Sequence, residues 1–368
     1  ESLVPRSDPL HRVQILSKIG DTLWDNGKAE ESTQILEQAL KALGVYIPTT
    51  TIEVFFGINV QFTVQMLHTI FPKLLVRQVY KKDQHKLLII IRIMTRLGHT
   101  YYFSDMNKTL YYLLRFLNVA EKIGPCSELA YAYVSAVAPW GVFPWYRRLE
   151  RDFKKGLEMS QKLNDRVREG IDYAYYSTFR CLSSNKAKEG IFYAKKAVSI
   201  LKPLGEYFEL GTAYVTIEMC SYIYGNFKEA LRINQEFQQL MKQANALQPF
   251  GWTFLQKCYI SSVIEDIPDE VIEDTKEGIR LMEITRDKSN VAYGLSFLAY
   301  AYLRRKKYAL AREAADKAAV IFDRLKGSWS MSIFTIGAQV YLDNITQDQE
   351  ISIEQKSCPS MLPLLGDR

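Results

Sequence analysis

The residue types that could carry out catalysis are few in this chain, and they are scattered. Its histidines are His11, His68, His85 and His99. They form no H-E-x-x-H motif and none has a cysteine nearby in the sequence, so a metal site is not indicated. No G-x-S-x-G motif marks a nucleophilic serine. Gly20 and Gly27 lack the spacing of a G-x-x-x-x-G-K-[ST] phosphate loop, and Ala29 replaces its hydroxyl residue. We therefore predict a protein that is not an enzyme and binds no cofactor.

One acidic stretch has the composition of a metal-binding set, such as that of an α-helical cyclase. Its members are Glu265, Asp266, Asp269, Glu270, Glu273, Asp274 and Glu277. Acidic residues at the start of a helix are favoured by the helix dipole, and the rest of this stretch fits a solvated helix face. This interpretation predicts no metal at the stretch.

A denser signal comes from aromatic residues that lie beside arginines. The chain holds 23 Tyr, 18 Phe and 5 Trp, and residues 139–148 combine turn residues, large aromatics and two arginines. Trp, Tyr and Arg are the types most enriched at binding hot spots. The candidate groove for a protein or peptide partner consists of Tyr101, Tyr102, Trp140, Trp145, Tyr146, Arg147 and Arg148. The alternative is that these aromatics pack between helices and cover an irregular turn.

The elements that position these residues are predicted by a recurring pattern. A small residue near the end of one helix is followed by a short turn and then by a second helix with Ala or Leu at fixed positions. Copies of the pattern occur at 16–40, 97–117, 222–231 and 298–318. Gly98 and Ala299 are expected to permit close helix contact, Ala230 and Ala311 to face them, and Gly225 to take the backbone conformation of the turn.

The spacing of the copies predicts the architecture. The anchor residues of the second helices are Ser32, Leu110, Gly190, Ala230, Val271 and Ala311. Their intervals are 78, 80, 40, 41 and 40 residues, so one unit is missing near Phe71 and one near Glu150. We predict an all-α fold, a right-handed α-α superhelix or tetratricopeptide-like solenoid of about eight helical hairpins with a period near 40 residues. A loose N-terminal arm is expected at 1–9, the repeat domain at 10–343 and a partly irregular tail at 344–368.

Composition narrows the protein class. The 368 residues are 48% hydrophobic and 24% charged, which excludes a disordered chain, and 19 Gly with 12 Pro exclude a collagen-like one. The net charge of +6 is mild, and the basic runs at 77–86, 147–155 and 304–307 are separated or interleaved with acidic residues. We expect solvated faces there and no nucleic-acid partner.

The cysteines and the chain start indicate a cytoplasmic protein. The cysteines are Cys126, Cys181, Cys220, Cys258 and Cys358. They are odd in number and widely spaced, so reduced thiols are expected rather than a disulfide framework. Residues 1–10 are polar and do not form a secretory signal. Residues 52–70 are interrupted by five polar residues, which favours a buried or interfacial amphipathic helix over a transmembrane segment.

Several of these stretches also resemble a known class of protein. Residues 16–44, 97–105, 117–125 and 127–133 are similar to the tetratricopeptide region of large multidomain signalling ATPases. This class includes maltose-regulator-type activators and ATPases linked to kinases or class III adenylyl cyclases. The resemblance covers about residues 10–340. It implies a regulatory or sensor region. Either its ATPase and output domains lie elsewhere in a longer polypeptide, or the helical module stands alone.

Two functions remain open from the sequence. The first is a non-catalytic scaffold for protein–protein interaction in signal transduction, which would bind a protein, a peptide or neighbouring domains of its own polypeptide. The second is a sensor with a pocket for a small hydrophobic ligand between helical hairpins. The abundant tyrosines and the apolar segment from Phe55 to Phe71 motivate this alternative.

Overall fold

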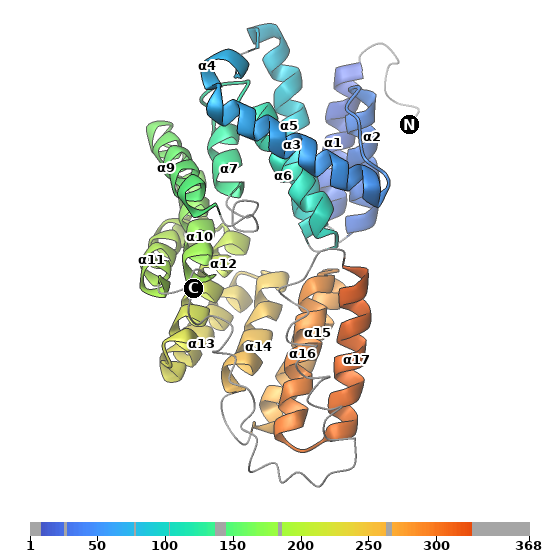
Figure 1. The fold of residues 1–368 in the computed structure, drawn as a ribbon. Helices are drawn as coiled ribbons and strands as arrows, with labels where there is room; N and C mark the ends of the chain where they lie inside the picture. The colour runs from blue at the N-terminus through green and yellow to red at the C-terminus, as the bar shows by residue number, and fades with distance from the viewer. Residues whose placement is uncertain are drawn as a thin grey trace. The chain divides into compact units, whose positions relative to one another are not determined.

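The computed structural model describes residues 9–25, 28–76, 79–102, 104–136, 145–182, 186–262 and 267–325. Within these ranges every regular element is an α-helix (Figure 1). The all-α array of helical hairpins expected from the sequence is thereby confirmed. The chain divides into two compact units, residues 1–172 and 173–368. Of the expected arm and tail, only Pro9 falls in the described residues, and α1 begins with it.

The first unit contains three regular hairpins and one irregular pair. Its helices are α1 (Pro9–Asp25), α2 (Ala29–Ala42), α3 (Thr51–Ile70), α4 (Pro72–Leu75), α5 (Lys81–Tyr102), α6 (Met106–Ala120), α7 (Ser127–Ser135) and α9 (Tyr146–Lys162). The pairs α1/α2, α5/α6 and α7/α9 pack as hairpins, and α5 touches both α1 and α7. The unit expected near Glu150 is the α7/α9 pair. The one expected near Phe71 has an altered form, because the long helix α3 is followed only by α4 and packs on α6.

The second unit continues the same plan. Helix α10 (Arg166–Leu182) crosses the division between the units. The helices that follow are α11 (Ala187–Leu204), α12 (Tyr207–Ile223), α13 (Phe227–Gln243), α14 (Leu247–Ser261), α15 (Asp269–Ile284), α16 (Lys288–Arg304) and α17 (Tyr308–Arg324). The first helices of successive hairpins, α12, α14 and α16, contact one another in order.

Backbone geometry shows the repeat more clearly than side chains do. The second helix of a hairpin is followed by a residue with left-handed φ, which ends the helix. These residues are Gly44, Gly124, Asn164, Gly205, Asn245 and Arg286. From Gly124 onward their intervals are 40, 41, 40 and 41 residues, whereas Gly44 and Gly124 are 80 apart. Gly225, predicted to serve the turn inside a hairpin, has a φ of +73°.

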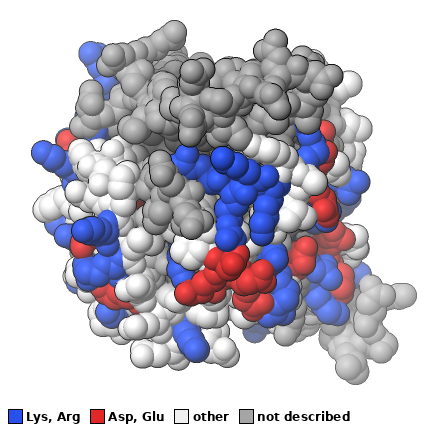
Figure 2. Space-filling view, turned by 90° about the horizontal axis from the view of Figure 1, so that it is seen from below, with Lys and Arg blue, Asp and Glu red and all other residues white. Residues whose placement is uncertain are grey.

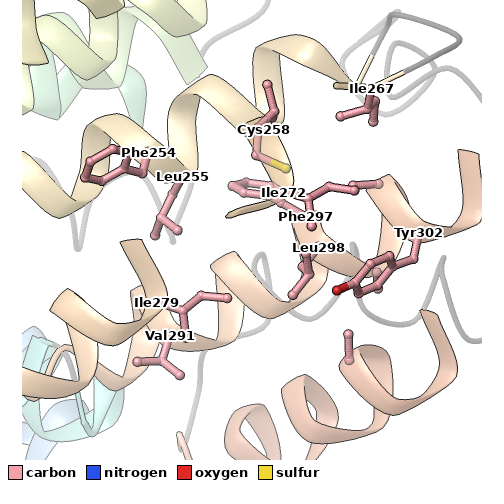
Figure 3. Close-up of a cluster of buried hydrophobic side chains, with 14 of the residues drawn as sticks. Phe254, Leu255, Cys258, Ile267, Ile272, Ile279, Val291, Phe297, Leu298 and Tyr302 are labelled. Carbon is pink, nitrogen blue, oxygen red and sulfur yellow. The ribbon is translucent and has the colours of Figure 1, made fainter. Parts of the chain in front are cut away.

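One core cluster of the second unit consists mainly of apolar side chains from α14, α15 and α16, with alanines of α17 (Figure 3). Cys258 of α14 lies toward Ile272 of α15 and Phe297 of α16. Small residues set the helix spacing. A Cβ on Gly278 would lie 3.1 Å from the carbonyl oxygen of Gly251, so α14 and α15 approach each other through their backbones.

The predicted role of Gly98 needs correction. A Cβ at this position would meet only the side chain of Leu113, at 3.7 Å, which is an ordinary contact. The close approach in the first unit depends instead on Gly156 of α9. A Cβ there would lie 2.7 Å from Val134 and 2.8 Å from the carbonyl oxygen of Ala130.

Candidate functional site

The stretch from Trp145 to Arg148 lies at the start of α9, the second helix of its hairpin. The Trp145 ring packs on Phe62 of α3 with ring centroids 5.2 Å apart. Tyr146 and Arg147 are exposed. Trp140 lies outside the described residues.

Arg148 is held inside the protein rather than offered to a partner. Its guanidinium donates to Asp152 at 3.2 Å and to the backbone carbonyl of Gln65 at 3.4 Å, and it also bonds the side chains of Gln65 and Thr69. The Arg148 side chain is 9% exposed and that of Asp152 only 1%. Arg148 therefore joins α9 to α3 and has a structural role.

The same network continues to the end of α6. The Gln65 amide donates to the Glu121 carboxylate at 2.8 Å, and Nδ1 of His68 lies 2.7 Å from the same carboxylate oxygen. Both His68 and Glu121 are nearly buried. Buried polar groups of this kind hold their elements in one arrangement when each is hydrogen-bonded. The network thus fixes α3 against α6 and α9.

Tyr101 and Tyr102, at the end of α5, have opposite environments. Tyr101 is buried, stacks on Tyr112 and donates to the Glu37 carboxylate at 2.6 Å. Burial and this hydrogen bond raise the pKa of Tyr101 above its usual range. Tyr102 is 44% exposed. Tyr101 and Tyr102 lie by the first turn of α6, where Lys108 bonds the Tyr101 hydroxyl. Arg148 contacts α3, which packs against the last turn of α6 through Asn118. Among the described members of the predicted groove, Tyr101 and Tyr102 thus lie apart from Trp145 to Arg148.

A different set of residues forms a continuous face in the first unit. The guanidinium of Arg96 on α5 donates to Asp21 of α1 at 2.8 Å, and that of Arg92 donates to Glu128 of α7 at 3.2 Å. His99 of α5 bonds the hydroxyl of Tyr131 on α7. The Arg168 guanidinium of α10 lies 4.3 Å from the centroid of the Tyr131 ring. We call this set the first-helix face: Asp21, Arg92, Arg96, His99, Glu128, Tyr131 and Arg168.

The charge of this face comes from its arginines and not from its histidine. Burial, and then the nearby Arg96 and Arg168, lower the pKa of His99 to about 4, so the imidazole is neutral near pH 7. Sequence reasoning did not select the arginines of this face. The signal was the spacing of Arg92, Arg96 and His99 at i, i+4 and i+7, which places them on one side of a helix.

The described members of the acidic stretch that resembled a metal site form ion pairs, whereas Glu265 and Asp266 lie outside the described residues. Lys257 contacts Glu270 and Asp274 at 2.8 and 2.7 Å, and Arg305 pairs with Asp269. Figure 2 likewise shows acidic and basic side chains gathered next to one another on one face. Across the ranges that the structure describes, no group of three His, Cys, Asp or Glu residues could hold a metal ion. None of the described helices is both long and apolar enough to cross a bilayer.

Comparison with known proteins gives matches among solved structures. No protein-family model and no curated protein matches the chain. It is similar to a Rap protein in complex with competence and sporulation factor, at 14% identity and a TM-score of 0.44, over 91% of this chain and 98% of that one. It is also similar to a signal transduction ATPase with numerous domains and a tetratricopeptide repeat sensor, from Pyrococcus horikoshii. Identity is 12% and the TM-score 0.47, over 86% of this chain and 53% of that one. This chain thus spans about half of the second protein.

Proposed function

We propose that this chain is a non-catalytic interaction module that binds a protein or peptide on its first-helix face. The observation that carries the proposal is the unbroken series of contacts from α1 through α5 and α7 to α10. Arg92 is 68% and Arg96 31% exposed, and each is oriented by one carboxylate. A guanidinium held in this way keeps further N–H donors in a planar fork that suits carboxylates. The expected partner is therefore a segment with Asp, Glu or a free C-terminus.

Within a longer polypeptide, the module would act as the regulatory or sensor region of a signalling ATPase, kinase or cyclase. This finer role rests on the sequence resemblance. The alternative, a small-ligand sensor, drew on the abundant tyrosines. Tyr222, Tyr259 and Phe297 pack against one another across α12, α14 and α16, with ring centroids 4.4 and 5.2 Å apart. Because these rings contribute to the core, we favour the interaction module.

The test uses peptides selected from a random display library on the folded protein. Selected peptides are synthesised with a fluorophore, and Kd is measured by anisotropy. We expect acidic peptides, whose affinity falls about tenfold in Arg92→Ala and in Arg96→Ala, equivalent to roughly 1.4 kcal/mol each. Circular dichroism checks that both variants keep their helix content.

Arg232→Ala is the matched control. Arg232 is 61% exposed and paired with Glu229, much as Arg92 is paired with Glu128, but it lies on α13, a second helix. It should leave the affinity unchanged. Selected peptides that bind all three variants as tightly as the parent protein would show that the first-helix face is not the binding surface.

A further inference from the structure

Helix α3 presents an apolar stripe that nothing in the preceding sections explains. Its exposed members are Ile52, Phe55, Phe56, Val60, Leu67 and Ile70, with exposed fractions from 41 to 69%. Ile52, Phe56 and Val60 are four residues apart, Leu67 and Ile70 continue the series after a gap of seven, and Phe55 lies beside Phe56, so all six lie on one side of the helix. We call these six residues the α3 stripe. Leu74 of α4, 60% exposed, continues it.

The opposite side of α3 is anchored, so the stripe is a fixed feature of the fold. Val54, Ile58, Gln65 and His68 are buried, and α3 lies across α6 (Figure 1). The helix start is also fixed, because Thr50 and Glu53 form a capping box. The exposed side chains therefore cannot turn inward without breaking this packing.

The polar residues within the stripe are internally satisfied. Asn59 donates its side-chain amide to the backbone carbonyl of Phe55 at 2.8 Å, and Thr63 donates its hydroxyl to the carbonyl of Asn59 at 2.8 Å. Protein–protein interfaces normally carry about one hydrogen bond per 100–200 Å². Since Asn59 and Thr63 already bond backbone carbonyls of α3, this surface suits a binding partner that forms no hydrogen bonds with it.

The stripe is large for an exposed surface. If a large apolar side chain offers about 150–200 Å², the exposed fractions of the six stripe residues correspond to on the order of 530–700 Å². The largest apolar patch on a typical soluble monomer is about 300–600 Å² and is often functional. An area of this size indicates a binding surface.

Basic residues lie beside the stripe. Lys73 of α4 is exposed next to Leu74, and α9 is held against α3 by the Trp145–Phe62 and Arg148–Thr69 contacts. Helix α9 has six basic and three acidic residues. Exposed Arg147, Arg151 and Lys154 follow the i, i+4, i+7 spacing along it, with Arg151 also paired to Asp152. The apolar surface thus has basic residues near its C-terminal end, on α4 and at the start of α9.

We propose that the α3 stripe docks on the surface of an anionic lipid bilayer. The stripe would lie in the plane of the membrane with its apolar side chains at the acyl boundary, while Lys73, Arg147 and Lys154 face the anionic headgroups. Trp145 and Tyr146 have the residue types that favour the headgroup level. A second copy of the chain is a less suitable occupant, because it would bring hydrogen-bonding groups that the stripe does not use.

Flotation with unilamellar vesicles tests the proposal. We expect the protein to float with vesicles of phosphatidylcholine mixed with phosphatidylserine, and to bind vesicles of phosphatidylcholine alone at least about tenfold more weakly. The double substitution Phe55→Ser/Phe56→Ser should lower binding to the anionic vesicles at least tenfold. Phe55→Leu/Phe56→Leu should retain it, because the apolar surface is kept. Arg147→Glu should lower binding to the anionic vesicles and reduce its dependence on salt.

The controls are residues of similar exposure elsewhere. Phe192 on α11 is 55% exposed and Arg232 on α13 is 61% exposed. Phe192→Ser and Arg232→Glu should leave vesicle binding unchanged. Failure of the parent protein to float with either vesicle overturns the proposal. Vesicle binding that is unchanged by Phe55→Ser/Phe56→Ser also overturns it. A third contrary result is a dimer in sedimentation analysis that this double substitution converts to monomer. The first-helix face is not altered by any of these variants, so the two proposals fail independently.

Discussion

The side-chain amide of Asn234 donates to the buried carboxyl group of Glu218 at 3.2 Å and to the backbone carbonyl of Thr253 at 2.9 Å. Asn234 on α13 therefore joins α12 to α14 through one amide group. Glu218 is fully buried, and burial raises its pKa to about 8, although the Asn234 hydrogen bond opposes this shift. The carboxyl group is accordingly protonated in the folded protein at neutral pH.

We predict that Glu218 makes the protein less stable as pH rises. Because its folded pKa is above the unfolded value of about 4.3, the folded state retains a proton that the unfolded state loses. The stabilisation that Glu218 provides is complete below about pH 4. Between about pH 4 and pH 8 it decreases by roughly 1.4 kcal/mol per pH unit. Glu218→Gln should remove this slope from urea unfolding measured between about pH 5 and 7.5. Exposed Glu273→Gln should not, and equal slopes in all three proteins would contradict the assignment.

Two neighbouring arginines should differ sharply in their effect on stability. Arg148→Ala removes the main partner of the buried Asp152 carboxylate and three contacts with α3, so we expect a loss of about 3 kcal/mol in the free energy of unfolding. Arg147→Ala, at an exposed position one residue earlier, should change it by less than about 0.5 kcal/mol. Urea titration of both variants gives the comparison. Similar losses for the two would mean that Arg148 does not link α9 to α3.

Two glycines should respond to alanine in opposite directions. Gly156→Ala places a methyl group 2.8 Å from a backbone oxygen of α7, which cannot move freely, and should cost about 1–3 kcal/mol. Gly98→Ala meets only an ordinary contact within a helix and should gain about 0.5–1 kcal/mol. Thermal unfolding measures both. A destabilised Gly98→Ala would restore the role in close packing that its sequence pattern indicated.

Three cysteines should resist alkylation in the folded protein. Cys181, Cys220 and Cys258 are buried, and burial raises the pKa of the Cys258 thiol to about 11. The thiol–thiol contact with Cys220, followed by burial, raises the pKa of Cys181. Since the thiolate is the reactive form, iodoacetamide near neutral pH should leave all three unmodified until urea is added. Peptide mass spectrometry reads out the sites, and rapid labelling of Cys258 in the native protein would contradict its placement.

Much of the fold could be predicted because it is encoded in local spacing. Ser32, Gly190, Ala230 and Ala311 were chosen as anchors from sequence, and each lies three residues after the first residue of its helix, in α2, α11, α13 and α17. Small residues recur there because neighbouring helices approach closely. Because these small residues recur at a nearly constant interval, the period could be recognised.

The candidate site could be predicted only in part, because exposure depends on helix rotation and on distant partners. Tyr101 and Tyr102 have the same residue type, but successive residues on a helix point about 100° apart, and only Tyr101 faces Glu37. Arg147 and Arg148 differ for the same reason. The environment of Arg148 is decided by α3, with which it forms hydrogen bonds. The packing of α3 across α6 depends on contacts between residues more than fifty positions apart, such as His68 with Glu121.

The residues with left-handed φ that end the second helices also show that the repeat period continues across the altered unit. Gly44 and Gly124 are separated by 80 residues, twice the interval between later members of the series. The segment containing α3 and α4 therefore has the length of one unit, and the residues after it remain in phase. An inserted loop would have no reason to match this period. Because this unit has the short α4 where the others have a full second helix, α3 lacks the neighbour that covers the first helix of a regular hairpin.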